Sequence, residues 1–93
     1  MTKTIMIAHG SAAVQAARII AAVSKDRDEK ARGYELAAQW HDKQEKACRE
    51  IANDIRVGQH VNLKAAVAAT HHGASAAGLR NAASRLMRPT TTE

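Results

Sequence analysis

Histidine and cysteine are the residues of this chain whose side chains are best suited to metal binding. The sequence holds five histidines and one cysteine: His9, His41, Cys48, His60, His71 and His72. Two ligands on one helix face need a spacing of about four residues. His41 and Cys48 lie two helical turns apart and His71 and His72 are adjacent, so neither pair has that spacing. The sequence predicts no metal site and no cofactor, and solvated or partly buried histidines are the favoured interpretation.

Catalytic side chains show no recognisable arrangement. No Ser/His/Asp set, Cys/His set or paired carboxylates can be assigned from spacing. Several acids instead precede a base by four residues, which is typical of weak ion pairs on a solvated helix face. These pairs are Asp26/Lys30, Asp28/Arg32, Asp42/Lys46 and Glu45/Arg49. The sequence therefore predicts a protein that is not an enzyme and that works by binding.

The charge distribution indicates what kind of partner is bound. The formal net charge is +5, yet residues 24–57 hold eight basic and eight acidic residues and are neutral. The excess lies near the two ends of the chain, in Lys3, Arg18, Lys64, Arg80, Arg85 and Arg88. A localised basic surface favours an anionic partner, either nucleic acid or an acidic protein.

The stretch of residues 63–88 combines small residues, one glycine and apolar residues in a particular order. Ala69, Gly73, Leu79 and Ala82 occupy the positions of the small residue, the turn glycine and the two later apolar residues of a helix-turn-helix. The stretch resembles the helix-turn-helix DNA-binding proteins. That resemblance implies a turn around residues 71–75 and a second helix that enters the major groove.

The same resemblance assigns candidate binding residues. It places Arg80 and Asn81, with Ala76 and Ala77, near base edges, where arginine and asparagine can read guanine and adenine. It places four further residues near phosphates: Lys64, Ser84, Arg85 and Arg88. We therefore expect duplex DNA as the favoured partner.

Apolar periodicity predicts an all-α fold, a small helical bundle with a long central helix and a C-terminal helical hairpin. One helix is expected from about Ser11 to Val23, a long one from Ser24 to a stop near Gly58 with a weak point at Gly33, and a final region over residues 62–88. Residues 2–8 leave three alternatives open: an extended arm, an intermolecular strand or the first turns of a helix. Residues 1–89 are expected to form one domain, with 90–93 as a disordered tail.

The apolar content sets expectations for assembly and location. Alanine supplies much of the 45% hydrophobic content and there is no phenylalanine, so the core is thin and a homodimer or a bound partner is expected. A single cysteine favours the cytoplasm. No stretch has the about 20 consecutive apolar residues of a membrane span, so no membrane partner is expected.

Two functions remain open from the sequence. The first is a small non-catalytic, nucleic-acid-associated regulatory or accessory protein that uses its basic C-terminal hairpin. The alternative is a protein inhibitor or adaptor of the kind that phages and plasmids encode, similar to anti-CRISPR proteins, which docks on a nucleoprotein complex through the same basic residues.

Overall fold

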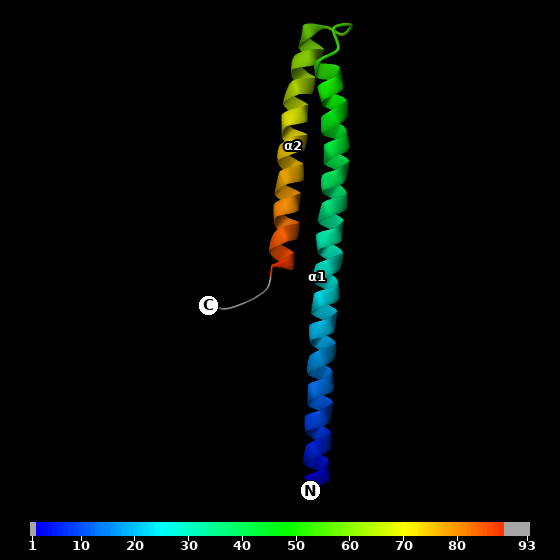
Figure 1. Ribbon diagram of the computed structural model, residues 1–93, viewed down its shortest axis with the longest axis vertical. Helices are drawn as coiled ribbons and strands as arrows, with labels where there is room; N and C mark the ends of the chain where they lie inside the picture. Colours follow the sequence, from blue (N-terminus) through cyan, green and yellow to red (C-terminus); the bar gives the residue numbers. More distant parts are fainter. Residues whose placement is uncertain (1, 89–93) are drawn as a thin grey trace.

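The chain folds into two helices that run antiparallel. The computed structural model describes the backbone of residues 2–88 and the side chains of residues 11–88. Helix α1 (Thr2–Ala52) has 51 residues and helix α2 (Gln59–Met87) has 29. A turn of residues 53–58 joins them, and α2 packs along the C-terminal half of α1 (Figure 1). The predicted all-α fold is confirmed.

The molecule is a rod. Its extents are 84 × 25 × 12 Å and its radius of gyration is 23.6 Å, whereas a compact chain of this length has a radius of about 12 Å. The reason is the unequal length of the helices: α2 ends beside the middle of α1, and the N-terminal half of α1 continues alone (Figure 1). No helix within the described residues is long and apolar enough to span a membrane.

Several expected interruptions are absent from these helices. Residues 2–8 form the first turns of α1, the third of the three alternatives, and α1 continues through Ser24 and Gly33. Helix α2 continues through residues 71–75, so the predicted turn there is wrong and with it the separate C-terminal hairpin. Within residues 2–88 no glycine has a positive φ. A helical glycine costs only about 1 kcal/mol relative to alanine, which the surrounding alanines and the contact between the helices offset.

The turn between the helices begins earlier than predicted. Helix α1 ends at Ala52, and Gly58 is the residue before α2, with φ −69° and ψ 153°. The side chain of Asn62, on α2, donates hydrogen bonds to the carbonyl oxygens of Ile51 at 2.7 Å and Asp54 at 3.0 Å. Carbonyl groups at a helix end lack partners inside the helix, so Asn62 both ends α1 and fixes α2 against it.

Alanine forms the contact between the helices. The buried apolar residues among those described are Ala31, Ala38, Ala65, Ala69 and Ala76, which we call the alanine interface. Ala31 and Ala38 on α1, like Ala69 and Ala76 on α2, are seven residues apart, the repeat of helices that pack along their length. Short side chains allow the two backbones to approach closely. The interface is therefore narrow and buries little area per residue.

Two glycines offer a test of helix strain. A methyl group added at Gly33 or at Gly78 would meet no other atom within 4 Å. Gly33→Ala and Gly78→Ala should each raise the free energy of unfolding by about 0.5–1 kcal/mol, because alanine has less freedom to lose on folding and a higher helix propensity. Thermal or urea unfolding followed by circular dichroism measures this. Unchanged or reduced stability in both variants would contradict two uninterrupted helices.

Candidate anion-binding face

The two helices carry different charges. Helix α2 contains no aspartate or glutamate, and its charged residues are Lys64, Arg80 and Arg85, with Arg88 directly after it. The acids of the described chain all lie in α1 and the turn, from Asp26 to Asp54. Anions are therefore favoured on the side of α2 that faces away from α1.

Three of the six predicted binding residues share one face of α2, and a fourth directly follows the helix. Because the helix is continuous, Asn81, Ser84 and Arg85 are spaced as i, i+3 and i+4, which places them on one side, and Arg88 follows at i+7 as the residue directly after the helix. All four are exposed. They form the anion-binding face discussed below: two guanidinium groups, one amide and one hydroxyl.

Lys64 lies on α2 but at the other end of it. It is exposed, and the rise of an α-helix separates it from Arg85 by about 32 Å along the axis. Lys64 therefore belongs to the same helix as the anion-binding face but does not adjoin it.

Arg80 is turned toward α1, away from the position that the resemblance implied. Its Nη2 lies 2.6 Å from Oδ2 of Asp42 and 3.3 Å from Oε1 of Glu35, and Nη1 and Nε donate further bonds to the same two carboxylates. The hydrogen bond from Arg80 holds the pKa of Asp42 below its ordinary value, and the two carboxylates raise the pKa of the guanidinium. Arg80 joins the helices and is already paired within the chain.

A pair of histidines also joins the two helices, His41 next to Asp42 on α1 and His72 on α2. Nδ1 of His41 lies 2.8 Å from Nδ1 of His72, so one ring donates and the other accepts. The ring of Trp40 meets both imidazoles edge-on. Within the described residues no three His, Cys, Asp or Glu side chains gather in a way that could hold a metal ion. Residue spacing missed this contact because it joins positions 31 residues apart.

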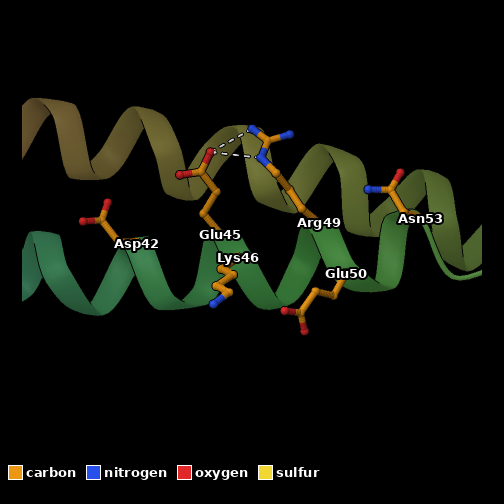
Figure 2. Close-up of a pocket in the computed structure, with 6 residues that line it drawn as sticks. All are labelled: Asp42, Glu45, Lys46, Arg49, Glu50 and Asn53. Atoms are coloured by element: carbon orange, nitrogen blue, oxygen red, sulfur yellow. Dashed lines mark hydrogen bonds and ion pairs between the residues drawn. The ribbon is translucent and has the colours of Figure 1, made fainter.

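A shallow groove of about 600 Å³ lies on α1 near the turn. Its lining residues are Asp42, Glu45, Lys46, Arg49, Glu50 and Asn53 (Figure 2). Glu45 and Arg49 bond to each other across it at 2.8 Å. Three carboxylates and two cations line this groove. It is therefore less suited to an anion than the anion-binding face of α2.

Glu45 also lies against the glycine in the middle of α2. A methyl group at Gly73 would lie 3.0 Å from Oε2 of Glu45. The residue that the helix-turn-helix pattern assigned to a turn therefore lies inside α2 and faces the carboxylate of Glu45 on α1.

Comparison with known proteins gives this chain no relatives. No protein-family model, no curated protein and no solved structure matches it.

Proposed function

We propose that this protein is a non-catalytic, DNA-associated accessory protein that contacts duplex DNA with the anion-binding face of α2. The observation that carries the proposal is the exposed group of Asn81, Ser84, Arg85 and Arg88, on and directly after a helix without acids. Arginine binds phosphate through two parallel N–H groups, and serine and asparagine commonly donate to phosphate oxygens. Asn81 is also suited to an adenine edge.

Lys64 supports duplex rather than single-stranded DNA as the partner. Lys64 lies about 32 Å from Arg85 along the helix. One helical turn of DNA is about 34–36 Å long, and the same side of the backbone recurs at that interval. A helix lying along the duplex brings both residues to phosphates. Arg80 takes no part, because Glu35 and Asp42 already neutralise it.

Salt dependence tests the proposal. Two to three phosphate contacts from Lys64, Arg85 and Arg88 should give a plot of log K against log salt concentration with a slope of about −2 to −3. Arg85→Glu combined with Arg88→Glu should abolish binding to a fluorescent duplex in anisotropy titrations. Helix content should not change, because exposed substitutions usually alter stability by no more than about 0.5 kcal/mol.

The control carries the same change of charge elsewhere. Lys43 and Lys46 are exposed on α1, and their reversal to glutamate should leave DNA binding within a few-fold of the unaltered protein. A folded protein that retains no DNA at low salt would contradict the proposal. Nuclease-resistant capture of an acidic protein that depends on Arg85 and Arg88 would instead assign the face to the alternative, a docking inhibitor or adaptor.

A further inference from the structure

The N-terminal half of α1 includes apolar side chains that no part of the described chain covers. Every side chain of residues 11–24, here called the free segment, is exposed. Four of them are large and apolar: Val14 at 48%, Ile19 at 61%, Ile20 at 67% and Val23 at 50% exposure. Arg18 is the only charged residue in the segment. Such a surface costs free energy in water and marks a site of association.

The free segment continues the interface that α1 already uses. Counting back in sevens from Ala38 and Ala31 reaches Ser24 and Ala17, which are also small. Val14, Ile20 and Ala21 flank Ala17 at spacings of three and four, and so lie on the same side of the helix. The face of α1 that packs against α2 at Ala31 and Ala38 therefore continues into the free segment. There, larger apolar residues lie beside the small ones.

We propose that a second copy of this chain covers the free segment. The α1 helices of two protomers pair antiparallel through their free segments, with the two-fold axis near Ala17. In this register Val14 of each protomer lies opposite Ile20 of the other, and the small residue Ala17 meets its own counterpart. This inference is independent of the proposed DNA contact.

The position of α2 decides the direction of pairing. In a parallel dimer both α2 helices would lie at the same level on the facing sides of the two α1 helices, and would hold them apart. In an antiparallel dimer the α2 helices lie at opposite ends of the rod, because each ends beside the middle of its own α1 (Figure 1).

The length of the free segment also fits a second copy, and its one charge does not oppose the pairing. Under two-fold symmetry the free segment of each protomer covers the equally long free segment of the other, so that Ala17, Val14 and Ile20 of both are covered together. No acidic residue precedes Asp26, and Arg18 lies off the line of Ala17 and Ser24, so its charge stays in water at the edge of the pairing.

Disulfide cross-linking tests the arrangement directly. With Cys48→Ser as the background, Ala17→Cys should give a disulfide-linked dimer on mild oxidation, because residues across the axis come within the about 4.4–6.8 Å between Cα atoms that a disulfide needs. Ala22→Cys, on the opposite side of the helix, should stay unlinked. Mixing Val14→Cys with Ile20→Cys should link the two different variants, whereas a link between two Val14→Cys chains would overturn the antiparallel register.

Association in solution gives a second readout. Sedimentation equilibrium should show a dimer at micromolar concentration, Ala17→Glu should be a monomer and Ala22→Glu should remain a dimer, all with helical circular dichroism spectra. The DNA affinity of the same variants, measured in parallel, tests the proposed contact of Arg85 and Arg88 independently of dimerisation. A chain that stays monomeric at every concentration would overturn the inference, and co-sedimentation of that monomer with anionic vesicles would assign the face to a lipid surface.

Discussion

Replacing Ala69 with leucine is expected to separate the two helices. Ala69 is fully buried, at 0% exposure, and Ala38 on the other helix is equally buried. Three extra carbon atoms have no space in this narrow interface, and overpacking costs about 1–3 kcal/mol. A chain of this size has a small margin of stability, so the loss is a large part of the total. Thermal unfolding followed by circular dichroism and by Trp40 fluorescence measures it.

Ala77 provides the matched control for this substitution. It lies on the same helix but is exposed, so Ala77→Leu should change the free energy of unfolding by no more than about 0.5 kcal/mol. The difference between the two variants isolates packing from helix propensity, because both exchange alanine for leucine within α2. Equal melting temperatures would mean that the helices do not meet through the alanine interface.

Reversing the charge of Arg80 is expected to lower the melting temperature, while reversing Arg85 leaves it nearly unchanged. Arg80→Glu places a third carboxylate beside Glu35 and Asp42, which now bond to the guanidinium. Arg85 is exposed on the anion-binding face, so its reversal should weaken DNA binding instead. The two variants carry the same charge, and loss of stability in Arg85→Glu alone would contradict the assigned roles.

The Arg80 ion pairs also predict a dependence on pH. The pKa of Asp42 is lowered in the folded protein by the hydrogen bond from Arg80. A lowered carboxyl pKa stabilises the fold above the unfolded value of about 4, and this stabilisation is lost as the pH falls through the folded value. Acid titration of the melting temperature should therefore show a smaller decline for Arg80→Met than for the unaltered chain.

Local patterns predicted local structure well. The expected pair Asp26/Lys30 is present at 3.3 Å, and Glu45/Arg49 at 2.8 Å, because residues four apart on a helix are neighbours wherever the helix lies. The all-α fold follows from the same periodicity. The other two expected pairs, Asp28/Arg32 and Asp42/Lys46, are not within ion-pair distance in the described part of the chain, and Asp42 binds Arg80 of α2 instead.

Glycine misled the prediction of helix boundaries. Gly33 and Gly73 were interpreted as a weak point and a turn, yet both lie inside helices. A single glycine changes the local preference by about 1 kcal/mol, less than the combined contribution of the alanines around it and the contact between α1 and α2. Gly73 in particular lies inside α2 and faces the side chain of Glu45 on the other helix.

Only those features of the candidate site that depend on local spacing could be predicted from the sequence. Asn81, Ser84, Arg85 and Arg88 can be grouped from spacing alone once α2 is known to be uninterrupted. The ion pairs of Arg80 could not be predicted, because its partners Glu35 and Asp42 lie 45 and 38 residues away in the sequence. Which residues meet at such separations depends on how the two helices are aligned along each other. The contact between His41 and His72 depends on that alignment too.

The turn at residues 53–58 also determines the order in which the hairpin closes. Contacts beside it, such as those of Asn62 with Ile51 and Asp54, join residues close in sequence, whereas Arg80 and Glu35 enclose a much longer loop. Closing a short loop loses less chain entropy than closing a long one. We therefore expect contacts between the helices to form first beside the turn and last at the open end. Substitution of Asn62 should then slow folding, whereas substitution of Arg80 should mainly accelerate unfolding.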